Sequence, residues 1–298
     1  MAQAVENAAI QPVKVSFWPK VRGAFKGAPV IPLTIIAVFI LAAALADLVT
    51  VHDPYAVKLP DRLIPPFWSD GGSLSHPFGT DPLGRDILTR VIYGARVSII
   101  ISAIALAVGG GVGTLIGLTS GYYGGKVDTL LMRMADITLA FPLILFAILL
   151  VMVLGPSMMN VVVAISLVLW ARYARVIRGE VLALMQQDFI GRARVSGASD
   201  IRIMYRHLLP NVMPTLIVLL TLQVGWVIIV EASLSFLGAG IPPPTPAWGS
   251  MLADGREYVS TAWWVTTAPG VAIMLVVLAF NLCGDWMRER LDPKQRSI

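Results

Sequence analysis

The stretch RYARVIRGEVLALMQQDFIGRARVSGASDIRIMYRHLLP, residues 172–210, decides the fold because it is a basic island between two apolar runs. It carries seven arginines, and charged side chains are costly inside a bilayer. The segment must therefore face water at one side of a membrane. The runs before and after it, residues 158–171 and 211–238, are predicted to cross that membrane.

The composition agrees with a helical membrane protein. The chain has 298 residues, of which 56% are hydrophobic and 14% are charged, whereas soluble domains carry about 25% charged residues. Apolar runs of about 18 or more residues indicate transmembrane helices. The net charge of +5 does not indicate nucleic-acid binding, since the basic residues cluster beside apolar runs. We expect an all-α polytopic protein whose surroundings are a lipid bilayer.

Six apolar runs predict six transmembrane helices. The fourth run is short, so we expect it to extend into the charged residues from Arg172 onward. The predicted spans are residues 30–51, 97–122, 134–155, 158–171, 211–238 and 264–283. Around them we expect a tail at 1–29, polar loops at 52–96 and 239–263, a transmembrane core at 97–284 that includes 172–210, and a tail at 285–298.

The distribution of positive charge predicts the orientation. Both tails, the short turn at 126–133 and the 172–210 segment together hold about 17 of the 23 Lys and Arg residues. Loops rich in Lys and Arg stay in the cytoplasm. We therefore expect both termini and residues 172–210 to be cytoplasmic, and the 52–96 and 239–263 loops to lie on the opposite side.

A glycine repeat in the second run predicts close helix packing. Gly109, Gly113, Gly117 and Gly121 recur every four residues and so share one helix face. The surrounding sequence lacks the Gly-Lys-Ser/Thr ending of a phosphate-binding loop. We interpret these glycines as a contact surface for a neighbouring helix.

The polar residues give little sign of catalysis or metal binding. His52, His76 and His207 are far apart in the sequence and have no ligand partner at helical spacing, so no metal site is expected. The sequence also has no Gly-x-Ser-x-Gly nucleophile motif. We predict no catalytic residue and no cofactor-binding residue in this chain.

Two acids at membrane depth are candidates for a translocation path, because an acid there is costly unless it has a role. Asp136 lies near the start of the third run, and Glu231 lies late in the fifth. A structural role in helix-to-helix bonding is the alternative for both. The candidate path residues are Asp136, Glu231, Ser233 and Ser235.

Within residues 172–210 the pattern predicts two helices. Leu182, Met185, Phe189 and Ala193 follow the spacing of one amphipathic helix. Gly197 is expected to end it, Ser199 to cap a second short helix, and Pro210 to block its continuation. The segment then serves either as a linker on the lipid surface or as a docking element for a cytoplasmic partner.

The spacing in this segment resembles the EAA loop of ABC-importer permeases, Glu-Ala-Ala-x3-Gly-x9-Ile-x-Leu-Pro. Gly197 stands thirteen residues before Pro210, as the pattern requires, while Gly191, Arg192 and His207 depart from it. The resemblance implies a loop that couples the permease to an ATPase. Its candidate residues are Phe189, Ala193, Gly197, Ala198, Ser199, Asp200, Arg206, His207, Leu209 and Pro210.

Further stretches resemble the second ("C") permease subunit of the dipeptide/oligopeptide/nickel importer family. They are HPFGTDPLGRDILTRVIYGARVSI (76–99), GYYGGKVDTLLMRMADITLAFP (121–142), EASLSFLGAGIPPPTPAWGSMLADG (231–255) and RHLLPN (206–211). The first contains the family's TDxxGRD motif and its flanking glycine, which here are Gly79, Thr80, Asp81, Gly84, Arg85 and Asp86.

The resemblance implies a type I ABC importer permease fold with a cytoplasmic coupling helix, in a bacterial inner membrane. It implies a heterodimer with a homologous permease subunit, two cytoplasmic ATPase subunits that bind ATP and Mg²⁺, and a periplasmic substrate-binding protein. The 52–96 and 239–263 loops are then expected to contact the binding protein. The chain itself would be no enzyme.

Peptides are the expected cargo. Nickel chelates, glutathione and opine-like conjugates, which relatives of this type handle, are the alternatives. An ion-coupled secondary transporter and an intramembrane enzyme are rival classes, but neither the broken helices with midplane acids of the first nor the paired catalytic residues of the second stand out in the sequence.

Overall fold

The computed structural model describes residues 27–291 and is helical, with one isolated bridge between Thr80 and Asp86 in the part described. Residues 1–26 and 292–298, which belong to the two predicted tails, lie outside the described range. The elements are α2 (Val30–Ala44), α3 (Ala46–Val49), η1 (Leu59–Asp61), α4 (Ile87–Tyr123), α5 (Gly125–Ala140), α6 (Leu143–Leu154), α7 (Met158–Met185), α8 (Asp188–Val195), α9 (Asp200–Ile203), η2 (Met204–Leu208), α10 (Leu209–Phe236), α11 (Trp248–Gly255), η3 (Arg256–Tyr258) and α12 (Trp264–Leu291).

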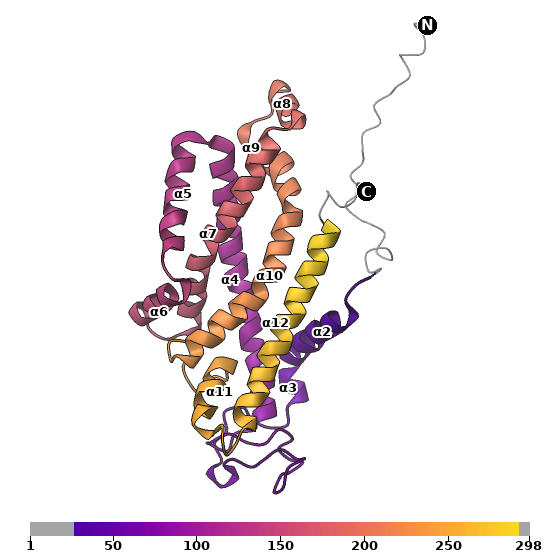
Figure 1. Ribbon diagram of the computed structural model, residues 1–298, viewed down its shortest axis with the longest axis vertical. Helices are drawn as coiled ribbons and strands as arrows, with labels where there is room; N and C mark the ends of the chain where they lie inside the picture. Colours follow the sequence, from indigo (N-terminus) through magenta and orange to yellow (C-terminus); the bar gives the residue numbers. More distant parts are fainter. Residues whose placement is uncertain (1–26, 292–298) are drawn as a thin grey trace.

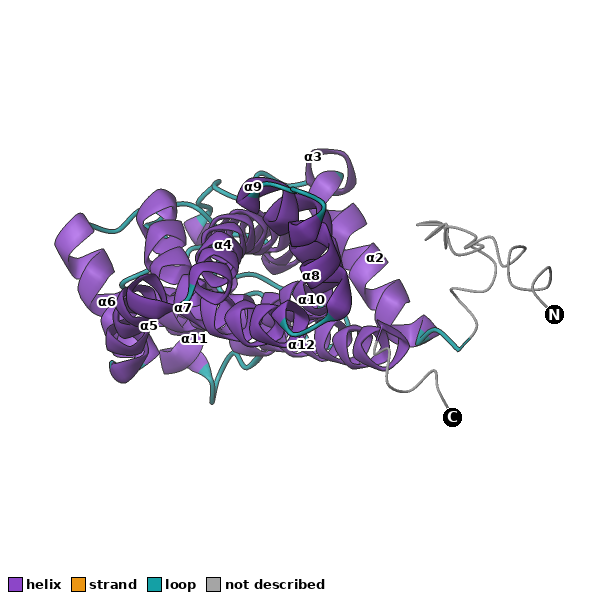
Figure 2. Cartoon of the chain, turned by 90° about the horizontal axis from the view of Figure 1, so that it is seen from above, coloured by secondary structure: helices purple, strands orange, loops and turns teal. Residues whose placement is uncertain are grey.

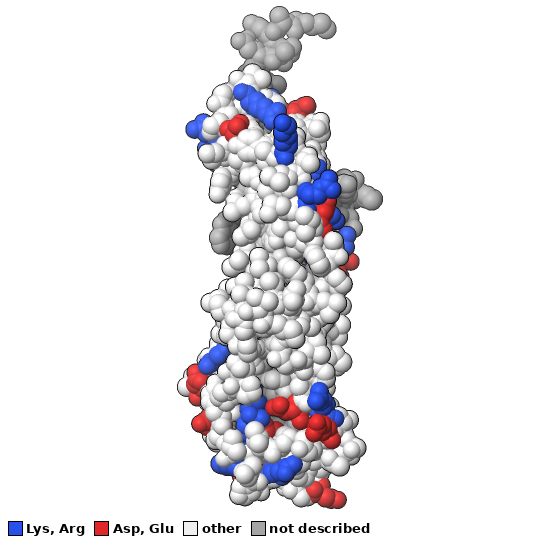
Figure 3. Space-filling model, turned by 90° about the vertical axis from the view of Figure 1, so that its left-hand side faces the viewer, with Lys and Arg blue, Asp and Glu red and all other residues white. Residues whose placement is uncertain are grey.

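Four helices in the described range are long and apolar enough to cross a membrane, and a bent pair of helices makes up to five. The four are Ile87–Tyr123, Met158–Met185, Asp200–Phe236 and Trp264–Arg290. The molecule is elongated, and Lys, Arg, Asp and Glu gather at its two ends on the face shown in Figure 3, which leaves an uncharged band between them. This distribution suits a protein that crosses a bilayer.

The second predicted span begins earlier than its apolar run. Helix α4 starts at Ile87 because the carboxylate of Asp86 caps it, accepting a hydrogen bond of 2.8 Å from the backbone N–H of Thr89. The helix then runs to Tyr123, so the last part of the predicted 52–96 loop is helical. The fourth span also extends as expected, since α7 continues past Arg172 to Met185.

The glycine face of α4 packs directly on α7, which confirms the packing prediction. A Cβ added at Gly113 would lie 2.4 Å from the carbonyl oxygen of Trp170, and one at Gly117 would lie 2.7 Å from that of Ala174. No larger residue fits at that distance. The two helices meet along a buried seam that includes Ile165, Leu169 and Tyr173.

The third predicted span is not one straight helix, which corrects that prediction. Helices α5 and α6 meet at an angle of 91°, and α6 lies across the others in Figure 1. The physical reason is Pro142, which has no N–H to donate to a helix and pushes Phe141 into an extended conformation (φ −83°, ψ 143°).

The remaining helices flank the packed pair formed by α4 and α7. Helix α2 packs on α12 and α4 at one edge of the molecule, and α5 and α6 lie at the opposite edge (Figures 1 and 2). Helix α10 packs on α12 and contacts both α4 and α7. Helix α11 lies with the 52–86 segment at one end, while α8 and α9 form the other end.

Candidate functional site

The segment that links α7 to α10 forms a helical tip, here defined as residues 186–208. Helix α7 ends at Met185 and α8 begins at Asp188, so the prediction of one amphipathic helix from Leu182 to Ala193 is wrong. The break falls at Gln187, whose backbone is extended (φ −85°, ψ 142°). Asp188 then opens α8, where a negative charge favours a helix N-terminus.

Gly197 ends α8, as predicted. Its φ of +77° lies in the left-handed region, which glycine adopts without a steric penalty. Its N–H donates to the carbonyl oxygen of Arg194 at 3.0 Å, and the N–H of Ala198 donates to the carbonyl oxygen of Ala193 at 3.1 Å. These two bonds are the Schellman pattern of a helix C-terminus. Ser199 then caps α9, as expected, by accepting a hydrogen bond from the N–H of Arg202.

Pro210 does not end the second helix, contrary to the prediction. Residues from Asp200 to Phe236 form one continuous helical span. The turn before the proline, Met204–Leu208, is a π-helix. Because proline lacks an N–H and crowds the preceding turn, the wider π turn accommodates it without a break. The short helix of the tip is therefore rigidly joined to α10.

The tip is anchored by apolar side chains on its inside, and its outer surface carries exposed arginines together with a few large apolar side chains. Ile190, Ile203 and Leu208 are buried, and Phe189, Ala193, Ala198, Met204 and Leu209 pack against the same core. The hydroxyl of Tyr122, at the end of α4, donates to Asp200 at 2.6 Å. Val195, Ile201 and Tyr205 instead expose 92%, 66% and 60% of their surface. Arg206 is exposed and His207 lies 6.5 Å from the ring of Phe189.

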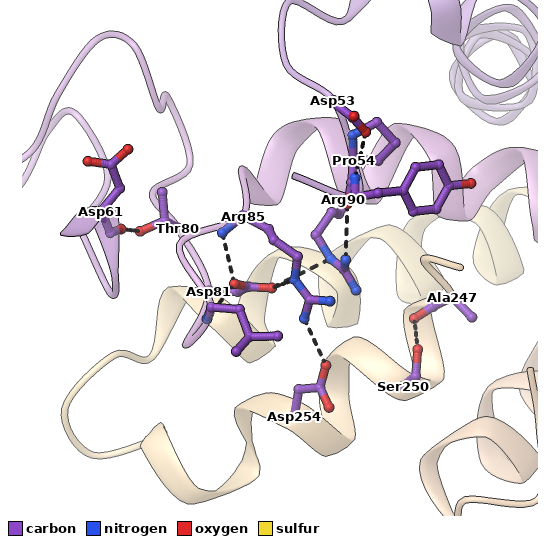
Figure 4. Close-up of polar contacts among 12 residues, drawn as sticks. Asp53, Pro54, Asp61, Thr80, Asp81, Arg85, Arg90, Ala247, Ser250 and Asp254 are labelled. Carbon is purple, nitrogen blue, oxygen red and sulfur yellow. Dashed lines mark hydrogen bonds and ion pairs between the residues drawn. The ribbon is translucent and has the colours of Figure 1, made fainter. Parts of the chain in front are cut away.

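The opposite end carries a charge cluster, defined as Asp81, Arg85, Arg90 and Asp254, in which the first three residues are buried and the side chain of Asp254 is 48% exposed. Nε of Arg85 donates to Asp81, and Nη2 of Arg85 donates to Asp254 on α11 at 3.3 Å (Figure 4). Nε of Arg90 lies 3.7 Å from Asp81, and Nη1 of Arg90 donates to the carbonyl oxygen of Pro54 at 3.2 Å. The cluster joins residues 52–96 to residues 239–263.

The family motif builds this end of the fold. Oδ1 of Asp81 accepts hydrogen bonds from the N–H groups of Leu83 and Arg85, which closes a tight turn. Gly84 sits in that turn with φ +73°, and a Cβ there would lie 1.8 Å from the carbonyl oxygen of Lys58. The hydroxyl of Thr80 donates a hydrogen bond to the backbone carbonyl oxygen of Asp61. Nε1 of Trp264 donates to the carbonyl oxygen of Thr80 at 3.3 Å. Gly79 and Asp86 complete the motif, Asp86 as the cap of α4.

The histidines are closer in space than in sequence. The rings of His52 and His76 stack with centroids 4.6 Å apart, and His76 contacts Asp86. The expectation that all three histidines lie apart is therefore wrong for this pair. His207 lies in the tip, at the other end of the molecule.

The four candidate path residues fall into separate places. Glu231 is buried on α10 and accepts hydrogen bonds from Ser235 at 2.8 Å and from Ser98 of α4 at 3.4 Å. The hydroxyl of Ser233 donates to the carbonyl oxygen of Ile229 in its own helix. Asp136 on α5 pairs with Arg175 of α7.

A cavity of about 300 Å³ lies beside Arg175. Leu139 of α5, Arg172 and Tyr173 of α7, and Leu219 and Gln223 of α10 also line it. The guanidinium of Arg172 lies 5.0 Å from the ring centre of Trp226. The cavity thus has two arginines on the side of α7 and is lined by both apolar and polar side chains of α5 and α10.

Sequence reasoning missed the partners of these charges. Ser98, Arg175, Arg90 and Asp254 were not singled out, although each bonds to a residue that was. Only Arg90 carried a local signal, since it stands four residues after Asp86 of the GRD motif. Asp254 is 169 positions from Arg85, and no local pattern connects the two.

The fold and its charged ends define a multi-pass helical membrane protein. Residues 113–297 match the family model of the binding-protein-dependent transport system inner membrane component. The chain belongs to this family, so it is a permease subunit of an ABC transport system in an inner membrane and not an enzyme.

Curated relatives extend the match over most of the chain. A putative peptide transport system permease protein of Brucella suis biovar 1 is 43% identical over 89% of this chain and 87% of its own. A dipeptide transport system permease protein of Alkalihalophilus pseudofirmus is 43% identical over 90% and 86%. A glutathione transport system permease protein of Escherichia coli O6:K15:H31 is 48% identical over 76% and 75%. The resemblance noted from the motifs is confirmed.

Proposed function

We propose that this chain is one of two homologous permease subunits of an ATP-driven importer of di- or oligopeptides. The observation that carries the choice of cargo is the 43% identity to permeases of peptide and dipeptide systems over about nine tenths of the chain. The motifs of residues 76–99 and 231–255 support the assignment to the second ("C") subunit.

The proposed topology has six spans with both termini in the cytoplasm. Helices α4, α7, α9–α10 and α12 supply four, the bent pair α5–α6 supplies a fifth, and α2–α3 supplies the first. The excess of Lys and Arg in the tails and in residues 172–210 supports this orientation. The tip is then cytoplasmic, and the charge cluster lies on the periplasmic side.

The tip is the proposed coupling element. Its exposed Val195, Ile201 and Tyr205 would be covered by a cytoplasmic ATPase subunit, which binds ATP and Mg²⁺. Because α9 and α10 form one continuous helix, movement of the ATPase would tilt α10 as a rigid body. That tilt would open the path alternately to the two sides of the membrane.

A periplasmic binding protein would deliver the peptide to the opposite end. The 52–96 and 239–263 loops lie side by side there and are joined by the charge cluster, so they offer one pre-formed surface. Asp136 and Ser233 remain candidates for the path, Asp136 because of its place beside the cavity at Arg175. The bonds of Glu231 and Ser235 to each other and of Glu231 to Ser98 favour the structural alternative for that pair.

The coupling role is tested by Gly197→Val, assayed with the partner subunits present. A β-branched residue at φ +77° would reshape the turn between α8 and α9, and we expect ATP-dependent uptake of a labelled dipeptide to fall at least tenfold. Membrane insertion should persist, since an added Cβ meets only open space. Uptake at the wild-type rate would contradict the coupling role.

Gly155→Val is the matched control. Gly155 also has a positive φ, +88°, and open space around it, but it lies between α6 and α7 and away from the tip. We expect this variant to share the backbone strain and to retain uptake. An equal loss in both variants would assign the effect to strain and not to coupling.

Glutathione is the second candidate cargo, because a glutathione permease is 48% identical over three quarters of this chain. Competition separates the two candidates. If peptides are the cargo, unlabelled dipeptide will suppress labelled dipeptide uptake and glutathione at equal concentration will not. The reverse result would favour glutathione import by the same machinery.

A further inference from the structure

A cavity of about 220 Å³ opens beside the charge cluster and has no role in the function proposed above. Its polar lining comprises His52, Asp53, Lys58, His76 and Asp86. The first three come from the segment after α3, and Asp86 caps α4. The cavity thus lies where the polar loop returns to the membrane-spanning helices.

Three of these residues offer metal-binding atoms close together. One ring nitrogen of His52, one of His76 and a carboxylate oxygen of Asp86 lie within 4.8 Å of one another. His76 and Asp86 are buried, and His52 is half-buried at the cavity wall. Side chains that share one metal ion approach each other to a few ångströms, so these atoms would bind one ion if the stacked rings of His52 and His76 turned toward it.

The hydrogen bonds of the two imidazoles indicate which nitrogen of each could face an ion. Nε2 of His52 lies 2.6 Å from the carbonyl oxygen of Ser75, which can only accept, so Nε2 carries the proton and Nδ1 keeps a free lone pair. Nδ1 of His76 lies 3.0 Å from Oδ1 of Asp86, so an ion that replaced the proton between these two atoms would bind both, and Nε2 of His76 would carry the ring proton. The carbonyl group of Ser75 would orient His52, and Oδ2 of Asp86 would keep its hydrogen bond to the N–H of Thr89.

We propose that His52, His76 and Asp86 form a binding site for a divalent transition-metal ion, with Zn²⁺ as the matching cation. Two imidazoles and a carboxylate suit Zn²⁺, whereas Mg²⁺ and Ca²⁺ favour all-oxygen sites. Asp53 lines the same cavity and can approach as a fourth ligand. Lys58 also lines it, and its long side chain allows the ammonium group to turn to water.

The ion would cross-link the polar loop to the membrane-spanning helices. It would join residue 52, residue 76 and the first turn of α4, which the structure links only by hydrogen bonds of His52, His76 and Asp86 in the described residues. The site does not depend on the identity of the cargo or on ATPase coupling. Its test is therefore independent of the transport assays.

The test measures Zn²⁺ binding by the full chain in detergent, purified with a tag that contains no histidine and stripped with EDTA. We expect one zinc ion per chain by mass spectrometry of the metal, and a rise in thermal stability when Zn²⁺ is added. His52→Gln, which removes a half-buried ligand, should weaken zinc binding at least tenfold and abolish the thermal shift. His207→Gln, which alters the histidine of the tip, should leave both unchanged.

X-ray absorption at the zinc edge supplies a second readout, with nitrogen ligands expected at about 2.0–2.1 Å. The proposal is wrong if the wild-type chain retains no zinc after dialysis. It is also wrong if His52→Gln and a His52→Gln/His76→Gln double variant bind zinc as the wild type does. In those cases the three residues form only a hydrogen-bonded fastening of the loop.

Discussion

The two ends of this protein differ in the kind of side chain that they bury. At the charge cluster, arginines are buried (Arg90 exposes 2% of its surface) and paired with carboxylates and a carbonyl group, although Nε of Arg90, 3.7 Å from Asp81, makes an ion pair without a hydrogen bond. At the tip, the buried side chains are apolar, and large apolar residues such as Val195 face outward. The charges buried at the first end find partners within the chain, whereas the second end buries apolar side chains only and exposes Val195, Ile201 and Tyr205 beside its arginines.

The difference indicates how each end meets its surroundings. A buried ion network is costly to rearrange, because each charge that loses its partner stays desolvated. Such an end offers a fixed platform. Covering the exposed apolar side chains of the tip with another protein would lower the free energy of the complex, and under the proposed function the continuous helix from α9 to α10 would carry that protein's motion into the membrane. The predictions below test this contrast, in order of their expected effect on the stability of the chain.

The largest effect is expected from Asp81→Asn. The amide keeps the size of the side chain and an oxygen for the N–H groups of Leu83 and Arg85, but it removes the charge between Arg85 and Arg90. Breaking a buried ion pair costs about 3–5 kcal/mol. We expect a loss of that size in the free energy of unfolding, measured by denaturation with SDS in mixed micelles.

Asp70→Asn is the matched control, because Asp70 is an exposed acid in the same polar loop. A surface substitution of this kind changes stability by about 0.5 kcal/mol or less. Equal stability of the two variants would show that the cluster is not a rigid platform. The contrast between the two ends would then fail at this end.

Much of the membrane architecture was predictable because lipid imposes simple rules on the sequence. Apolar runs marked α7, α10 and α12, and the four-residue glycine spacing marked the seam between α4 and α7. The turn at Gly197 and the cap at Ser199 were predictable because each is a local interaction of the backbone. Local chemistry and hydrophobicity are both readable along the chain.

The predictions that failed concerned prolines whose effect depends on the surrounding helix and contacts between residues distant in the sequence. Pro210 was expected to end a helix, but a π turn absorbs it. Pro142 was overlooked within an apolar run that it bends by 91°. The pairs Arg85–Asp254 and His52–His76 arise only when distant loops fold together, so hydrophobic periodicity says nothing about them.

A smaller effect is expected from Tyr122→Phe, which loosens the tip from α4. The substitution removes the hydrogen bond of 2.6 Å from the tyrosine hydroxyl to Asp200 and keeps the ring. The net value of such a bond is about 0.5–1.5 kcal/mol. We expect a loss in that range, with faster amide hydrogen exchange confined to residues 198–205.

Tyr123→Phe controls for the loss of a hydroxyl group, since Tyr123 is the exposed neighbour of Tyr122 on the same helix end. We expect its exchange pattern to match the wild type. Faster exchange throughout the chain in Tyr122→Phe would mean that the tip is part of one cooperative unit with the membrane core. The tip would then lack the separate character that the comparison assigns to it.

The smallest effect on stability is expected from Ile201→Ser, which alters the uncovered surface of the tip. Ile201 exposes 66% of its surface, so its replacement should change the free energy of unfolding by no more than about 0.5 kcal/mol. Binding should respond more strongly, because truncating a well-placed apolar contact at an interface costs about 1–2 kcal/mol. We expect several-fold weaker co-purification of the ATPase subunits. Leu74→Ser, which alters a side chain that is 81% exposed in the opposite loop, should leave that co-purification unchanged. Equal ATPase recovery with both variants would mean that the apolar side chain at position 201 is not part of the docking surface, because exposure alone would then not distinguish the tip from the loop.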